Sequence, residues 1–172
     1  MCNEELEELE PFFGDEVVLS EDDDELITQL YEVFVKDFVT NPFQVEGATV
    51  LIKDVLSEHL GLPYFFNQYR HDFVHCITRK SDYTKRRVFE PERANRIHWI
   101  KPILLNHHER SIKYYLFTES DGKVRDYFWY EEKKYVVILE KVSADYWLIS
   151  GHCVDDELKH RRRFQKYHFN GR

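Results

Sequence analysis

The hydrophobic pattern from residue 20 to residue 42 predicts one long amphipathic helix. Four apolar side chains recur at every fourth position and share one face: Leu26, Leu30, Phe34 and Phe38. Acidic residues crowd the start of this segment, where they would stabilise the positive end of the helix dipole. Asn41 and Pro42 would end the helix. A weaker pattern predicts a second helix from about residue 48 to residue 59, ended by Gly61.

Apolar and polar positions alternate in "HDFVHCITR", residues 71 to 79, and predict a strand. One face of this strand would carry every second side chain: Phe73, His75 and Ile77. A basic loop separates it from "FEPERANRIHWIKPILL", residues 89 to 105, whose apolar side chains predict a helix that packs on a sheet. Pro91 suits the first helical position, and Pro102 would kink or end the helix.

Four short runs after residue 110 are rich in Val, Ile, Tyr, Phe and Trp and predict an antiparallel meander. The runs lie at residues 111–119, 124–130, 134–142 and 146–154. Helices first and a sheet afterwards indicate the α+β class, with N-terminal helices followed by a helix packed on an antiparallel meander of four to five strands. We expect a loose arm over residues 1–20, within an acidic helical region (1–66) that precedes a basic domain (67–172).

The composition indicates a soluble protein with a substantial core. The 172 residues are 42% hydrophobic, and no apolar run approaches the roughly 18 residues of a membrane span. The N-terminus is acidic and lacks the features of a signal peptide, so we expect no membrane association. Cys2, Cys76 and Cys153 are odd in number and widely spaced. They argue for a reducing, cytoplasmic compartment and against disulfides or a cysteine-based zinc site.

The net charge of −8 conceals two halves of opposite sign. Residues 1–60 hold 17 Asp and Glu against two Lys, a formal charge of −15. Residues 61–172 hold 15 acids and 22 bases, a charge of +7, together with eight of the nine histidines. A basic half is the electrostatic footprint of a polyanion ligand, so nucleic acid becomes a candidate despite the acidic total. Mutual neutralisation of the two halves on folding explains the split equally well.

Arginine and histidine residues in the basic half match the needs of metal-free RNA cleavage. A histidine can take the proton of the ribose 2′-OH, and arginine forks stabilise the charge that builds on the phosphorane oxygens. In one helix, Arg93 and Arg96 would lie about 60° apart and reach one anion together. The candidate catalytic groups are His75, Arg93, Arg96 and the strand hydroxyl of Ser150. The candidate RNA contacts nearby are Arg79, Arg87 and Trp99, the last as a stacking platform.

Simpler explanations compete with these assignments. A lone histidine on a strand is more often a hydrogen-bonded structural residue than a catalyst, and this applies to His75. Arg93 or Arg96 could form an ion pair with a neighbouring glutamate or with the acidic half of the chain. Ser150 could be no more than a serine at the end of a strand.

The basic end of the chain, "KHRRRFQKYHFNGR", interleaves bases with aromatics over residues 159–172. This composition is typical of a nucleic-acid contact segment. Its candidate RNA contacts are Arg161, Arg162 and Lys166. A solvated, partly disordered C-terminal tail would have the same composition, and the sequence does not separate the two possibilities.

The remaining histidines do not indicate a metal site. The residues considered are His107, His108, His152, His160 and His168. Adjacent histidines cannot easily share one ion, and the sequence has no HExxH or CxxC pattern. The phosphate-binding and dinucleotide-binding glycine motifs and the nucleophile elbow are also absent from the sequence. We therefore expect no metal and no cofactor.

The order of these segments resembles a known nuclease superfamily. The stretches "FVHCITR", "RRVFEPERANRIHWIKPIL" and "YVVILEKVSADYWLISGHCVDD" are similar to the phage-associated branch of the barnase–EndoU–colicin–RelE (BECR) superfamily, over about residues 70–168. The resemblance implies a helix packed on a four-stranded antiparallel sheet and a metal-independent toxin ribonuclease. The residues that match the motif positions of that branch are His75, Arg93, Arg96 and Ser150. His152 stands where the branch has an aromatic, so it is either a second acid–base group or a departure from the family.

We therefore expect a toxin-like endoribonuclease that cleaves RNA by 2′-OH transesterification without metal, with tRNA as one candidate substrate. The alternative is a non-catalytic RNA- or protein-binding module, a phage or host interaction factor on a degenerate nuclease-like fold. The expected partners are RNA and, for the acidic N-terminal half, a cognate inhibitor or a basic partner protein. Convergence of His75, the arginines and a hydroxyl in one accessible cleft favours the nuclease, whereas burial of His75 in the core favours the binding module.

Overall fold

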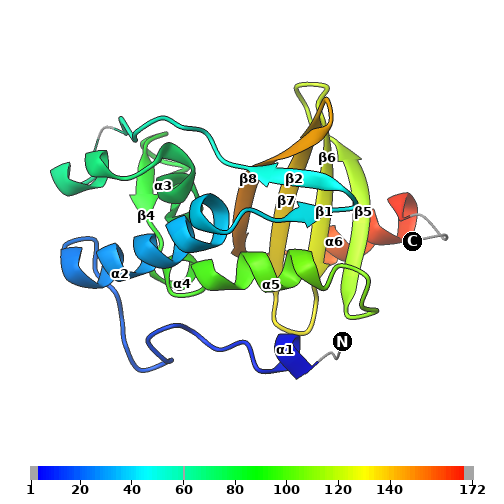
Figure 1. The fold of residues 1–172 in the computed structure, drawn as a ribbon, viewed down its shortest axis with the longest axis horizontal. Coiled ribbons are helices and arrows are strands. Elements are labelled where there is room, and N and C mark those ends of the chain that lie inside the picture. The colour runs from blue at the N-terminus through cyan, green and yellow to red at the C-terminus, as the bar shows by residue number, and fades with distance from the viewer. Residues whose placement is uncertain (1–3, 60, 169–172) are drawn as a thin grey trace.

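The structure is a computed structural model that describes residues 4–59 and 61–168 (Figure 1). The α-helices are α1 (Glu4–Glu7), α2 (Asp24–Val35), α3 (His71–Ile77), α4 (Pro91–Ala94), α5 (Ile100–Leu105) and α6 (Glu157–Tyr167). Further helical turns are the π-helix η1 (Lys36–Thr40) and the 3-10 helices η2 (Tyr64–Gln68) and η3 (Ile97–Trp99). The strands are β1 (Gln44–Val45), β2 (Ala48–Leu51), β3 (Thr78–Lys80), β4 (Arg87–Phe89), β5 (Ile112–Thr118), β6 (Val124–Tyr130), β7 (Tyr135–Val142) and β8 (Asp145–Cys153).

One curled sheet of six strands, in the order β1-β2-β8-β7-β6-β5, forms the centre of the fold (Figure 1). The consecutive strands β5 to β8 form the antiparallel meander that the sequence predicts. The α+β class is confirmed, whereas the predicted count of four to five strands is wrong. The hairpin of β1 and β2 adds two strands, because β2 pairs in parallel with β8. Strands β3 and β4 form a separate two-stranded ribbon.

The helix predicted for residues 48–59 is wrong. Residues 48–51 form strand β2, in which the buried Ala48 and Val50 alternate with partly exposed side chains. The rest of the segment reaches a single bridge between Leu56 and Arg70, just before α3. A local pattern cannot reveal this outcome, because β8, the strand that pairs with β2, lies near the other end of the chain.

The helix predicted from residue 20 to residue 42 is confirmed as α2 and its continuation η1, which ends directly before Asn41 and Pro42. Its buried side chains are Ile27, Leu30, Phe34 and Phe38. The Phe34 ring lies 5.4 Å from the ring of Phe73, so the apolar face of α2 packs directly on α3. Burial of this face stabilises both helices, since aromatic side chains remove a large apolar area from water.

The strand predicted at residues 71–79 is also wrong, because residues 71–77 form helix α3 and strand β3 begins only at Thr78. The side chains of α3 that are fully enclosed by the core are Phe73, Val74, Cys76 and Ile77. A helix with a broad apolar face permits this burial, whereas an alternating strand does not. Over so few residues the sequence fits both the helical period of 3.6 residues and the strand period of two residues. Packing against α2 and β8 decides in favour of the helix. His75 therefore lies on a helix, where it is half-buried.

The single helix predicted within residues 89–105 is wrong, because the segment consists of α4, η3 and α5. The interruption lies at Asn95 and Arg96. The Asn95 side chain accepts a hydrogen bond from the Phe13 amide at 2.8 Å, and Arg96 leaves the helical region with a φ of −122°. Helix α5 continues past Pro102, because a proline in the first turn lacks only an N–H that has no partner within the helix.

The N-terminal arm, residues 4–20, packs on the rest of the protein, so the expectation of a loose arm is wrong. Its side chains Leu6, Leu9 and Leu19 are buried. A single hydrophobic cluster extends from Leu6 to Leu148 and draws on both sides of the expected boundary at residues 66 and 67. The acidic and basic halves therefore share one core.

Helix α6 covers the opposite face of the sheet, where a second hydrophobic cluster includes Tyr115, Trp129 and Val136 (Figure 1). The alternative of a disordered C-terminal tail is therefore wrong as far as Tyr167, where α6 ends. Residues 169–172 of that tail lie outside the described residues. Within the described ranges, no helix combines the length and the apolar character that a membrane crossing requires.

Candidate anion-binding site beside strand β8

Two arginine side chains from different elements meet at one backbone carbonyl. Arg87, the first residue of β4, donates from Nη2 to the Thr78 carbonyl oxygen at 2.7 Å. Arg93, in α4, donates from Nη1 to the same oxygen at 2.9 Å. Arg87 Nε also donates to the Thr78 hydroxyl at 2.7 Å. The shared acceptor holds two like charges close together, which is unfavourable unless an anion lies near them.

Neither guanidinium group forms an ion pair with a carboxylate among the described residues. Burial is the largest cause that lowers the pKa of both arginines, and the charge of Arg93 lowers the pKa of Arg87 further. The Glu90 carboxylate raises the pKa of Arg93, but it forms its ion pair with Arg79 at 2.8 Å. Arginine remains charged at neutral pH even so. The pair is therefore a half-buried positive site.

His75 lies beside these arginines on α3. Arg87 Nη2 donates a second hydrogen bond to the His75 carbonyl oxygen at 2.9 Å. Burial, followed by the charge of Arg87 and then by nearby histidines and Arg93, lowers the pKa of His75 to about 3. The imidazole is therefore neutral at pH 7 and has a lone pair that can accept a proton. It is half-buried, which leaves it within reach of solvent.

Two further histidines extend from His75 toward a hollow in the surface. The ring of His71 stacks on His75 with their centroids 6.1 Å apart, and the ring of His59 lies 4.9 Å from that of His71. The hollow has a volume of about 570 Å³ and is lined by Val55, Leu56, Glu58, His59 and His71. Its partly apolar walls and imidazole rings suit a flat aromatic group such as a nucleobase. Neither His59 nor His71 was a predicted site residue, since the available signal, two histidines four residues apart, has meaning only on a helix.

Ser150 and His152 form a hydrogen-bonded pair near the end of β8, with 2.8 Å between Ser150 Oγ and His152 Nδ1. Their partners on β7 belong to the cluster beneath α6, so the pair faces that side of the sheet. Burial and then the charge of Arg93 lower the pKa of His152 to about 3, and His75 contributes to the same shift. The pair therefore lies on the α6 side of the sheet, whereas α3 and α4 contact β8 from the other side (Figure 1).

No family model, curated protein or solved structure matches this chain. The resemblance to the BECR superfamily therefore stays an expectation from sequence motifs, and the chemistry of the site is argued from its geometry. We define the β8-edge cluster as His75, Arg87 and Arg93, which lie on the α3 and α4 side of β8. It contains two of the predicted catalytic residues, His75 and Arg93, and it adds Arg87, which was predicted only as an RNA contact. The predicted Ser150 and His152 face the α6 side of the sheet, so the structure does not bring them to this cluster.

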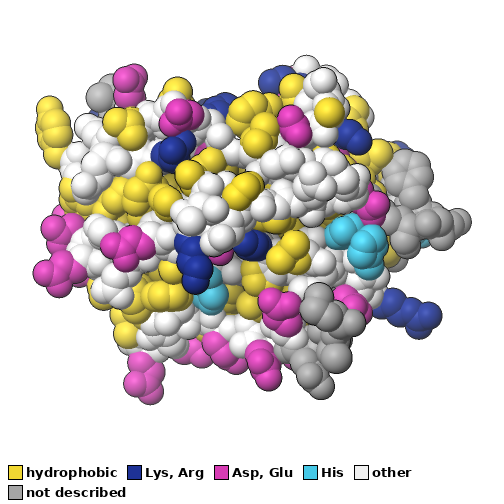
Figure 2. Space-filling model, viewed as in Figure 1, with side chains coloured by type: hydrophobic (Ala, Val, Ile, Leu, Met, Phe, Trp, Pro, Cys, Tyr) yellow, Lys and Arg dark blue, Asp and Glu magenta, His cyan; other side chains and the backbone are white. Residues whose placement is uncertain are grey.

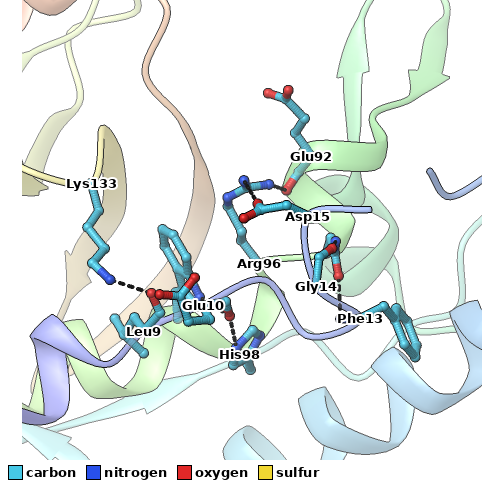
Figure 3. A network of polar contacts seen from close by, with 11 residues as sticks. Leu9, Glu10, Phe13, Gly14, Asp15, Glu92, Arg96, His98 and Lys133 are labelled. Carbon is cyan, nitrogen blue, oxygen red and sulfur yellow. Dashed lines mark hydrogen bonds and ion pairs between the residues drawn. The ribbon is translucent and has the colours of Figure 1, made fainter. Parts of the chain in front are cut away.

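Arg96 faces the N-terminal arm (Figure 3), and Trp99 contacts the same arm. Arg96 Nη2 lies 4.0 Å from the Asp15 carboxylate, and the Trp99 indole N–H donates to the Glu10 carbonyl oxygen at 3.0 Å. The Trp99 side chain is buried, so a base could stack on it only if the arm moved. The helical spacing that would let Arg93 and Arg96 reach one anion is absent, because the helix breaks between them.

The other predicted RNA contacts lie outside the β8-edge cluster: Arg79, Arg161, Arg162 and Lys166. Arg79 forms its ion pair with Glu90, and Arg161 Nη2 forms one with Glu131 at 2.7 Å. Three of the four belong to α6, on the other side of the sheet from α3 and α4 (Figure 1). A long RNA would have to pass around the molecule to contact both groups.

The histidines considered for a metal site are separated by the fold. His160 is buried beneath α6, where its Nδ1 lies 2.7 Å from the Tyr115 hydroxyl. His168 Nδ1 donates to the Phe164 carbonyl oxygen at 2.6 Å. His107 and His108 lie together at the end of α5, away from the β8-edge cluster (Figure 1).

We expect the folded protein to lose stability as the pH falls from about 6.5 toward 5. His75 and His152 have a pKa of about 3 in the folded protein, whereas an unfolded histidine has a pKa of about 6.5. In this interval the unfolded chain binds more protons, so each histidine can lower the free energy of unfolding by up to about 1.4 kcal/mol per pH unit. Urea unfolding at a series of pH values measures the slope. The variant His152→Gln should have a shallower slope, and equal slopes would contradict the assignment.

Proposed function

We propose that this protein binds an RNA phosphate at the β8-edge cluster and cleaves RNA there without a metal ion. The observation that supports this proposal is the Thr78 carbonyl oxygen that accepts from both Arg87 and Arg93. Two adjacent guanidinium groups without a carboxylate partner among the described residues match the charge and the oxygen geometry of a phosphodiester. The neutral imidazole of His75 supplies a group that can exchange protons.

The chemistry that fits these groups is transesterification by the ribose 2′-hydroxyl. His75 takes the hydroxyl proton as the 2′ oxygen bonds to phosphorus, and Arg87 and Arg93 stabilise the charge on the phosphorane oxygens. The bond from phosphorus to the 5′ oxygen then breaks. That oxygen takes a proton from water, and the hydroxide that forms takes the proton held by His75, which restores the neutral imidazole. The products are a 2′,3′-cyclic phosphate and a 5′-hydroxyl.

A non-catalytic RNA-binding module is the second candidate, and the low pKa of His75 favours it. An imidazole with a pKa of about 3 is a weak base until a bound phosphate offsets the nearby positive charges. Arg87 also has a structural role, because it donates to the His75 and Thr78 carbonyls at the end of α3. Binding of RNA without cleavage would need only the arginines and the hollow.

We further propose a cytoplasmic protein with an acidic surface for a second partner. The free Cys76 and Cys153 support a reducing compartment. Figure 2 shows Asp and Glu side chains along the edges of the molecule where the N-terminal arm and α2 lie. This surface suits a basic protein, such as a cognate inhibitor that also shields the β8-edge cluster.

The test is to incubate the purified full chain with total RNA, and separately with tRNA, in excess EDTA and to map the new ends. We expect cleavage with 2′,3′-cyclic phosphate ends, because no step requires a metal. The variant His75→Gln, purified in the same way, controls for contaminating ribonuclease and should not cleave. Binding of RNA without cleavage by the wild type would support the second candidate. A wild-type protein that neither binds nor cleaves RNA would overturn the proposed function.

A further inference from the structure

A second cluster of titratable side chains lies at the end of α5, away from the β8-edge cluster. His107 and His108 follow α5, and Glu46 occupies the turn between β1 and β2. Each residue offers one ligand atom, and these three atoms lie within 4.8 Å of one another. Figure 2 shows histidine at the surface on this side of the molecule.

The hydrogen bonds of His107 determine which of its nitrogens is available to a ligand. Nδ1 lies 2.8 Å from the Leu104 carbonyl oxygen, which can only accept, so Nδ1 carries a hydrogen. Nε2 lies 2.8 Å from Glu46 Oε1. This is a hydrogen-bond distance, and a metal ion that displaces the shared proton would bind both atoms. A backbone carbonyl that accepts from the outer nitrogen is also typical of metal-bound histidine.

His108 adds a second imidazole to the same carboxylate. Adjacent histidines cannot easily share one ion, so the sequence alone does not predict this site. In the turn after α5, however, the rings of His107 and His108 lie against each other with centroids 3.8 Å apart. His108 Nδ1 lies 3.8 Å from the Glu46 oxygen that faces His107. The turn therefore directs a nitrogen of each ring toward one carboxylate.

The turn that carries Glu46 has a conformation that few residues other than glycine adopt. Glu46 has a φ of 50° and Gly47 a φ of 79°, in a two-residue turn closed by the Val45–Ala48 pair. Turns of this type favour Asn or Asp followed by Gly, so Glu is an uncommon residue at this position.

We propose that Glu46, His107 and His108 bind a divalent transition-metal ion, with zinc as the natural occupant. Two imidazole nitrogens and one carboxylate oxygen are a common protein ligand set for zinc, and they leave a position for water. The side chains of His108 and Glu46 are 70% and 45% exposed, so an ion can enter from solvent. The bound ion joins the β1–β2 hairpin to the end of α5, and this role is independent of RNA cleavage.

The test is calorimetric titration of the EDTA-stripped full chain with Zn²⁺. We expect one ion per chain for the wild type, and an affinity weaker by at least about tenfold in Glu46→Gln and in His108→Gln. Both residues are partly or fully exposed, so these variants should fold, whereas replacement of the buried His107 risks unfolding. The variant His168→Gln removes an exposed histidine elsewhere and should bind as the wild type does.

Titration with Co²⁺ gives a second readout of the same site. We expect visible absorption from the bound ion without the near-ultraviolet band that a cysteine thiolate would add, and loss of this absorption in Glu46→Gln. Equal affinity of the wild type and the three variants, or no binding by the wild type, would overturn the proposal.

Discussion

Replacement of Arg93 by alanine is expected to slow RNA cleavage by about 10²–10³-fold, which is the usual effect of removing one donor that stabilises transition-state charge. Arg93 is one of the two guanidinium groups at the Thr78 carbonyl, so its loss leaves the phosphorane with Arg87 alone. The variant should fold, because the Arg93 side chain makes one hydrogen bond to the chain and no ion pair among the described residues. Initial rates on one defined RNA in EDTA measure the effect, with thermal unfolding as the check on folding.

The variant Arg96→Ala is the matched control for this experiment. It removes the same charge from the same segment, but Arg96 faces Asp15 and the N-terminal arm (Figure 3). Its ion pair is partly exposed and contributes little to stability, so we expect nearly wild-type cleavage and nearly wild-type unfolding. Equal losses in the two variants would contradict the assignment of catalysis to the β8-edge cluster.

The variant Gly151→Ala is expected to destabilise the fold by about 1–3 kcal/mol, because it adds volume to a filled core. Gly151 lies on β8 where α5 crosses the sheet. A Cβ at this position would lie 2.6 Å from both Cδ1 and Cγ1 of Ile100 and 2.9 Å from the Tyr135 hydroxyl. Both neighbours are fully buried, so the helix and the strand would have to separate. Urea unfolding of the variant and the wild type gives the difference directly.

A double-mutant cycle with Ile100→Ala tests the cause of that loss. Ile100→Ala alone should cost about 2–5 kcal/mol, the usual range for a buried isoleucine. In the double variant the new methyl group occupies space that Ile100 has vacated, so the combined loss should be clearly smaller than the sum of the two single losses. Additive losses would show that Gly151 is needed for a reason other than close packing.

The elements that the sequence predicted correctly are those with a long and local pattern. The meander alternates over four successive strands, and α2 repeats its apolar face over three turns. The segments that were predicted wrongly are short, and their partners are distant in the sequence. Residues 71–77 fit a strand until α2 and β8 enclose them, and β2 becomes a strand only because β8 pairs with it.

The site likewise combines residues that the sequence alone identifies with contacts that depend on distant parts of the chain. Residue type alone identified His75, Arg93 and Ser150 as candidates. Nothing in the sequence indicated that Arg87 and Arg93 share one carbonyl, because that depends on the β3–β4 ribbon. Arg96 points toward the N-terminal arm and not toward the anion site of Arg93. This direction depends on Asn95, whose side chain accepts a hydrogen bond from the Phe13 amide, 82 residues earlier in the chain.

The parallel pairing of β2 with β8 also has a consequence during synthesis of the chain. Val50 pairs with Tyr146, so strand β2 has only its hairpin partner β1 until β8 has left the ribosome, and such distant pairing slows folding. Strand β8 also packs against α3 and α4, which carry His75 and Arg93 of the β8-edge cluster. A protein that cleaves RNA at this cluster would therefore assemble its site only after β8, which ends at Cys153, has been made. The nascent chain would pass beside ribosomal RNA in an inactive form.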